Sequence, residues 1–374
     1  MLEGNEMEDV YERLREKLDG MTKGYPRTEQ GSEMAFLKKA FSREDAEFFI
    51  KFKPGLQSPQ QVADHMGISI EEARDRLESM AKKGLLYWQK DGGEKRYRII
   101  PFIHGLWEFR VDRFDSDDAA NMRQFYRDGF GKTLLDYRLP IARVVPIKPE
   151  TVKDGKLLPE DDIEAAIKRQ TLIVANDCAC RKVAIFARKP CTCTDNVNLC
   201  IAFGRMAEFM LESNIGNPHV ITVGQALDIL HKDDKAGMFV QMAHARDCSG
   251  FCNCVKCHCG ILIGAKIEQG TAFETWSNYK CVKDESVCIS CGKCVERCPM
   301  KAATLDEDKK VVFNPARCFG CGLCVTTCPS GALILVRKPD DRLTLPEDEG
   351  FFDNQERMGH EKAAVDRARA KTGS

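Results

Sequence analysis

The spacing of apolar and polar residues changes four times along this chain of 374 residues. Helical spacing dominates the first hundred residues, and short apolar runs bounded by glycine or proline follow. We expect an α+β protein of several domains. The expected parts are a charged lead, a helical part ending in a strand pair, a cysteine-rich α/β middle part, a cysteine-dense part and a polar tail, with bounds 1–33, 34–110, 111–282, 283–337 and 338–374.

The segment 34–110 carries three serines where helices should begin. Ser42, Ser58 (followed by proline) and Ser69 are placed as N-caps. Apolar residues after Ser69 predict one buried helix face, formed by Ile70, Ala73, Leu77 and Met80. Residues 85–90 and 95–100 flank an Asp-Gly-Gly turn and predict a hairpin. This order resembles the winged helix-turn-helix fold.

The charges of this module favour protein docking over DNA binding. The helix that would enter the major groove covers residues 70–83, and its first turn carries Glu71 and Glu72, which phosphates would repel. The hairpin offers the opposite charge, at Lys90, Lys95, Arg96 and Arg98. DNA binding remains the alternative.

Further elements are expected outside this module. A short helix over Met7–Leu18 should open the chain, and a solvated helix over Gln355–Lys371 should close it. In the middle we expect strands at 141–147 and 171–176, a helix at 159–170, and a helix from about Asn196 to Ser213. That last helix would place Cys200 in its first turns, where the helix dipole favours a thiolate.

Composition and charge exclude few classes of function. The formal net charge is −1, which argues for neither nucleic acid nor an anionic membrane as a partner. The first twenty residues lack the apolar core of a secretory signal, and no apolar run is long enough for a membrane span, so we expect a cytoplasmic protein. The fragment GFGKT at 129–133 lacks the first glycine of a phosphate loop, and we expect no nucleotide site.

The cysteines are the strongest chemical signal. All nineteen lie between Cys178 and Cys328. In a long chain without a secretory signal, this density indicates metal ligation by thiolates rather than disulfides.

Residues 288–329 contain Cys-x2-Cys-x2-Cys-x3-Cys-Pro twice. This doubled run closely resembles the bacterial ferredoxins that hold two [4Fe-4S] clusters, in which the fourth cysteine of each run ligates the other cluster. The resemblance implies one cluster on Cys288, Cys291, Cys294 and Cys328. It implies a second on Cys318, Cys321, Cys324 and Cys298. Two structural zinc sites are the less favoured alternative, because zinc does not need this doubled pattern.

Residues around the doubled run should shape the backbone. Gly292 and Gly322 are expected to relax the chain where it wraps each cluster. Short strands are expected at 302–305, 311–313 and 332–336.

Eleven cysteines lie outside the doubled run, ten of them in two groups. The pattern CxCR, a downstream cysteine pair and CNCxxCxCG resembles a family of multicluster iron–sulfur proteins of anaerobic bacteria and archaea. The resemblance implies one or two more [4Fe-4S] clusters, with zinc in one group less favoured. The expected ligand sets are Cys178, Cys180, Cys191 and Cys200, and Cys252, Cys254, Cys257 and Cys259. Cys193, Cys248 and Cys281 are left over, and His258 is expected to support a ligand rather than bind.

The expected function is electron transfer, as a carrier or as the relay subunit of a cytoplasmic redox complex that docks other redox proteins. One alternative is an oxidoreductase with a cluster active site in the middle part. Another is a redox-sensing winged-helix regulator.

Overall fold

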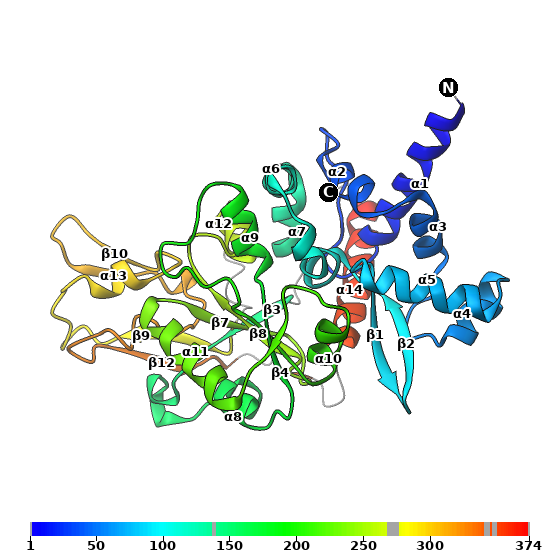
Figure 1. The fold of residues 1–374 in the computed structure, drawn as a ribbon. Coiled ribbons are helices and arrows are strands. Elements are labelled where there is room, and N and C mark those ends of the chain that lie inside the picture. The colour runs from blue at the N-terminus through cyan, green and yellow to red at the C-terminus, as the bar shows by residue number, and fades with distance from the viewer. Residues whose placement is uncertain (1, 137–139, 268–276, 340–344, 346–349, 373–374) are drawn as a thin grey trace.

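The computed structural model describes residues 2–136, 140–267, 277–339, 345 and 350–372 (Figure 1). The N-terminal helices and hairpin lie at one end of the molecule, together with the C-terminal helix. The central sheet lies in the middle, and the cysteine-dense part lies at the other end. Within the described residues, no helix is both long enough and apolar enough to cross a membrane.

The N-terminal part consists of five helices and a two-stranded antiparallel hairpin. The helices are α1 (Leu2–Asp19), α2 (Ser32–Ala40), α3 (Arg43–Lys51), α4 (Pro59–Met66) and α5 (Ile70–Lys82), and the strands are β1 (Leu86–Asp91) and β2 (Glu94–Ile99). The three expected caps are confirmed, since the side chains of Ser42, Ser58 and Ser69 each accept a hydrogen bond from the backbone N–H three residues later. Tyr97 of β2 also pairs with Gln57, which ties the hairpin to the segment before α4.

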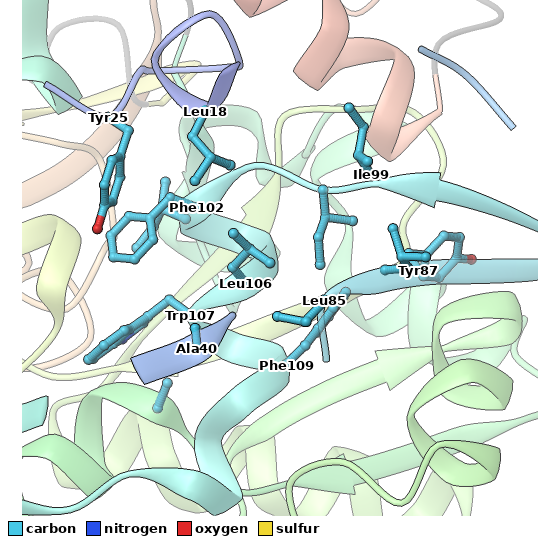
Figure 2. Packing of buried hydrophobic residues seen from close by; sticks show 14 of the residues in the cluster. Leu18, Tyr25, Ala40, Leu85, Tyr87, Ile99, Phe102, Leu106, Trp107 and Phe109 are labelled. Carbon is cyan, nitrogen blue, oxygen red and sulfur yellow. The ribbon is translucent and has the colours of Figure 1, made fainter. Parts of the chain in front are cut away.

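The hairpin packs against distant parts of the same chain. The Tyr87 ring lies 4.8 Å from Phe209 of α10 (Gly204–Glu212) and 4.4 Å from Phe352 of α14 (Phe351–Thr372). The Nε1 atom of Trp88 donates a hydrogen bond to Ser213. Figure 2 shows Tyr87, Leu106 and Phe109 among the side chains of one buried cluster. This packing fixes the helical end of the molecule to the central sheet.

The C-terminal helix α14 is not the solvated helix that we expected. Phe352 and Met358 are buried, and so are Asn354, Gln355 and Lys362. The buried face is largely polar and is held by hydrogen bonds, such as that from Gln355 to the carbonyl of His104. Because helical periodicity detects only apolar faces, it could not identify this one.

The central sheet has six antiparallel strands in the order β3-β7-β8-β5-β4-β6. They are β3 (Ala142–Val145), β7 (Phe239–Ala243), β8 (Gly250–Cys254), β5 (Cys200–Phe203), β4 (Ile173–Asn176) and β6 (His219–Val220). One face packs on α8 (Ile163–Lys168) and α11 (Val223–Ala236). The expected strands at 141–147 and 171–176 are confirmed, and the helix expected at 159–170 is shortened to α8 after a 3-10 turn at Pro159–Asp161.

The helix expected to begin near Asn196 is wrong. Residues 196–199 have no regular structure, Asn198 donates a hydrogen bond to the Asp177 carboxylate, and Cys200 begins strand β5. The apolar run Ile201–Phe203 is buried between β4 and β8, and a central strand satisfies its backbone on both sides. The helix α10 begins only at Gly204.

The cysteine-dense part contains two small antiparallel sheets. Strand β10 (Ala303–Leu305) pairs with β11 (Val311–Phe313), as expected. The strand expected at 332–336, β12 (Leu333–Arg337), pairs instead with β9 (Tyr279–Lys283), which precedes both cysteine runs. Helix α13 (Lys293–Arg297) lies within the first run. Four further short helices among the described residues are α6 (Ser116–Phe125), α7 (Gly131–Asp136), α9 (Ala179–Phe186) and α12 (Gly260–Ile267).

Candidate iron–sulfur sites

One pocket gathers cysteines from both runs of the cysteine-dense part. It is lined by Cys288, Cys291, Cys294 and Cys328, together with Lys283 and Ser290. Three of these cysteines come from the first run and one from the end of the second. The set is the one that the sequence assigns to the first cluster, and its ligation of a cluster remains a prediction.

A second pocket is lined by Cys318, Cys321, Cys324 and Cys298, with Cys281 beside them. Backbone N–H groups point at two of the sulfurs, that of Ala302 at Cys298 (3.2 Å) and that of Cys281 at Cys318 (3.4 Å). Such N–H groups stabilise negative charge on cluster ligands and so affect the reduction potential.

Cys281, which the sequence left without a role, belongs to this second site. Its Sγ lies 3.7 Å from that of Cys324, and this sulfur–sulfur contact lowers the pKa of Cys324, against the effect of burial. The same contact, together with burial, raises the pKa of Cys281. No sequence pattern indicated this role, because the pairing of β9 with β12 brings Cys281 to the second run.

The middle part contains a cavity of about 410 Å³ that is lined by cysteines from both sequence groups. These are Cys178, Cys180, Cys200, Cys252, Cys254, Cys257 and Cys259. Cys200 of β5 stands opposite Cys252 of β8, and because side chains alternate along a strand, Cys254 lies on the same face. This face is opposite to the one covered by α8 and α11. The sheet itself therefore determines the positions of the thiols of Cys200, Cys252 and Cys254.

Six of these thiols have another thiol within hydrogen-bonding reach, as one pair and one group of four. Cys178 and Cys180 are within hydrogen-bonding reach of each other, and Cys252 is within reach of both Cys200 and Cys254. Cys254 is also within hydrogen-bonding reach of Cys259, and the N–H of Gly260 donates a hydrogen bond to the Cys180 sulfur at 3.3 Å. The two sequence groups therefore interleave in space.

Two members of this group favour the thiolate form. The hydrogen bond from Cys180 lowers the pKa of Cys178 to about 6, burial opposing and Arg181 assisting. Hydrogen bonds from Cys200 and Cys254 lower the pKa of Cys252. The same contacts raise the pKa of their partners Cys180, Cys200 and Cys254, so these shifts reflect close packing of thiols, the donor type that soft metals select.

Cys191, Cys193 and Cys257 form a separate group. Their sulfur atoms all lie within 4.8 Å of one another. Cys248 is separate again, because it packs against the opposite face of the sheet, where burial raises its pKa to about 11. Cys191 and Cys257, which were expected in different ligand sets, thus lie together, and Cys257 also lines the cavity.

Polar residues also line the cavity, and two of them, Glu108 and Tyr126, lie far from any cysteine in the sequence. Glu108 accepts a hydrogen bond from the N–H of Gly105, and burial raises its pKa to about 8. Tyr126 is buried beside it, and His258 is buried with no protein partner for either ring nitrogen among the described residues. Sequence reasoning missed Glu108 and Tyr126, because no local pattern links them to the cysteine groups.

The comparison with known families covers the cysteine-dense part. Residues 287–332 match the family model of the 4Fe-4S dicluster domain. The match includes the eight cysteines of the doubled run but not Cys281. Comparisons with curated proteins and with solved structures give no match.

The donor set of the two pockets fits this family. Each pocket offers four cysteine sulfurs, the ligand set of a [4Fe-4S] cluster, and backbone N–H groups lie at two of the sulfurs of the second pocket. Residues 287–332 are therefore similar to an iron–sulfur domain that holds two [4Fe-4S] clusters. When bound, each cluster supplies one-electron chemistry, and the surrounding residues set its potential.

Proposed function

We propose that the protein relays electrons between a cluster in the middle cavity and the two clusters of the dicluster domain. It would act as a carrier or as the electron-transfer subunit of a cytoplasmic redox complex in an anaerobic type of metabolism. The observation that carries this proposal is the third set of converging thiols, which lies next to the dicluster domain and is joined to it by packed side chains.

The packing offers a short route between the two parts. Phe319 lines the second pocket, and its ring lies 4.8 Å from that of Phe239 in an edge-to-face contact. Phe239 is the strand partner of Cys254, which lines the middle cavity. One pair of rings therefore separates the two cysteine sites.

Hydrogen bonds hold the two parts in this relation. Arg297 of the first run donates to the carbonyl of Lys235 at 2.9 Å. Asn278, before β9, donates to the buried Asp161 carboxylate at 2.7 Å. Fixed spacing between cofactors is what a relay requires.

The test is a metal count on protein purified without oxygen, with EPR spectra of the reduced state. Because each cube holds four irons, we expect about twelve to sixteen irons per chain. Cys252→Ala should lose the middle signal and about four irons. Cys248→Ala, on the opposite face of the sheet, should lose none. A wild-type content of about eight irons would confine electron transfer to the dicluster domain, and fewer than eight would overturn the assignment as a whole.

A second candidate function is an oxidoreductase whose active site is the middle cavity. The cavity has polar groups that cluster binding does not use, namely Glu108 and Tyr126, and exposed cations at its rim, Arg123, Arg127 and Lys189. This arrangement favours a small anionic substrate. The EPR signal to follow is the one that Cys252→Ala removes. A change in this signal when an anionic ligand is added to the wild type, but not when it is added to Arg127→Ala, would support this function. If anionic ligands do not change the spectra, the enzyme function is excluded and only the relay function remains.

We also propose that residues 34–110 form a winged helix that serves as a docking module. Support comes from the order of α3, α4, α5 and the hairpin, and from the pairing of Gln57 with Tyr97. The hairpin already contacts α10 and α14 of this chain, so docking is partly internal.

A further inference from the structure

The thiols of Cys191, Cys193 and Cys257 converge at the surface near the cavity. Cys191 and Cys193 lie on the loop between α9 and β5, and Cys257 lies on the turn between β8 and α12. The N–H of Cys193 donates to the Cys191 sulfur at 3.4 Å, and Cys257 is exposed. The loop and the turn are brought together only by the fold.

The spacing of these sulfurs suits a single ion rather than a cube. Zinc binds thiolates at about 2.3 Å in a tetrahedron, which places the sulfurs roughly 3.8 Å apart. In a [4Fe-4S] cube each thiolate binds a different iron, so its ligand sulfurs stand farther apart. The three sulfurs here lie within 4.8 Å of one another.

The same structure provides an internal contrast. Across the described part of the chain, no other three cysteine, histidine or acidic ligands come this close together. No three of the run cysteines around either dicluster pocket lie within this distance of one another. No three of the six paired or grouped thiols of the middle cavity do so either. No three of the other expected cluster ligands come as close together as these three sulfurs.

We propose that Cys191, Cys193 and Cys257 bind one Zn²⁺ ion, separate from any cluster, with the fourth position facing solvent. Three soft thiolates select zinc over hard cations. The ion would join the loop that follows Cys178 and Cys180 to the turn between Cys254 and Cys259. It would therefore hold together the two segments that carry the cavity thiols. The inference does not depend on a cluster in the cavity.

The first test is the metal content of Cys193→Ser, because Cys193 does not line the cavity. Wild-type protein should contain about one zinc per chain, as expected for one site. Cys193→Ser should lose this zinc and keep its iron and its reduced-state EPR spectrum. Cys248→Ser is the matched control and should keep both metals. Loss of about four irons in Cys193→Ser would instead assign these thiols to a cube.

A second measurement needs no variant. Co²⁺ replacing zinc in the full chain should give the intense thiolate charge-transfer and visible d–d absorption of a tetrahedral sulfur site, and Zn²⁺ should bleach the d–d bands. Wild-type protein with no zinc and no Co²⁺ spectrum would overturn the proposal. A disulfide among the three thiols in protein purified without oxygen would do the same.

Discussion

At the residue scale, Gly320 makes the second cluster site sensitive to a single methyl group. Its φ is +69°, and a Cβ there would lie 2.3 Å from the carbonyl oxygen of Tyr279. Gly320→Ala should displace β9, and with it the N–H of Cys281 that points at Cys318. We expect the second cluster's EPR signal to be lost and iron to fall by about four per chain.

Gly331→Ala is the matched control for this prediction. Gly331 has a similar φ of +67°, but open space surrounds the added Cβ. The control carries only the left-handed backbone cost of about 1 kcal/mol and should keep both clusters. Full iron content in Gly320→Ala would show that β9 yields without affecting the site.

The glycines show what a sequence motif can predict at this scale. Gly292 and Gly322 were expected from the motif, and both have a φ of +77°. Gly320 was not singled out, because its importance comes from the carbonyl of Tyr279, forty-one residues earlier. Motif spacing reports local backbone needs, whereas close approach of distant segments appears only in the fold.

A second residue-scale prediction concerns a buried ion pair. Arg143 and Asp161 are each 1% exposed at the side chain and lie 2.8 Å apart, and Asp161 also accepts from Asn278. Arg143→Met would leave the carboxylate buried without its cation. The free energy of unfolding should fall by about 3–5 kcal/mol in denaturant titrations.

Lys168→Met is the control for this change. It breaks a solvent-exposed pair with Glu164, four residues before it. Such pairs contribute about 0.5 kcal/mol or less. Equal losses in the two variants would contradict the importance of the buried pair.

At the element scale, α14 should contribute strongly to stability although its sequence predicted a solvated tail. Phe352 packs on the Tyr87 ring and lies 4.6 Å from the Arg98 guanidinium. Phe352→Ala should lower the free energy of unfolding by about 3 kcal/mol. His360→Ala, exposed on the same helix, should change it little. If thermal unfolding shows the two variants to be equal, α14 does not stabilise the hairpin.

Strand β5 shows the opposite limit of prediction at this scale. The caps of α3, α4 and α5 depend on serines next to each helix, and the sequence predicted them correctly. The conformation of Cys200 depends on β4 and β8, which are distant in sequence, and there the helix was wrong. The grouping of the middle thiols followed the same pattern, because the sheet decides which sulfurs face each other.

At the scale of the whole molecule, the charges of the hairpin are already engaged. Lys90 pairs with Glu208 (2.8 Å) and with Glu212, both on α10. Lys95 lies 2.9 Å from Glu78 and 4.2 Å from the centre of the Trp88 ring. These cations form ion pairs within the molecule, so the hairpin does not offer a free basic surface to DNA.

This arrangement predicts that the protein does not bind DNA as a winged-helix regulator would. The first turn of α5 adds exposed Glu71 and Glu72 at the position that would face the major groove. In fluorescence anisotropy with mixed-sequence duplexes, we expect no binding beyond the weak non-specific range of about 10⁻⁴–10⁻⁶ M, in both the reduced and the oxidised state. Glu71→Lys with Glu72→Lys should increase the non-specific affinity and give a steeper salt dependence. Tight wild-type binding that weakens steeply with salt, and that changes with redox state, would instead establish the regulator and make the clusters its sensor.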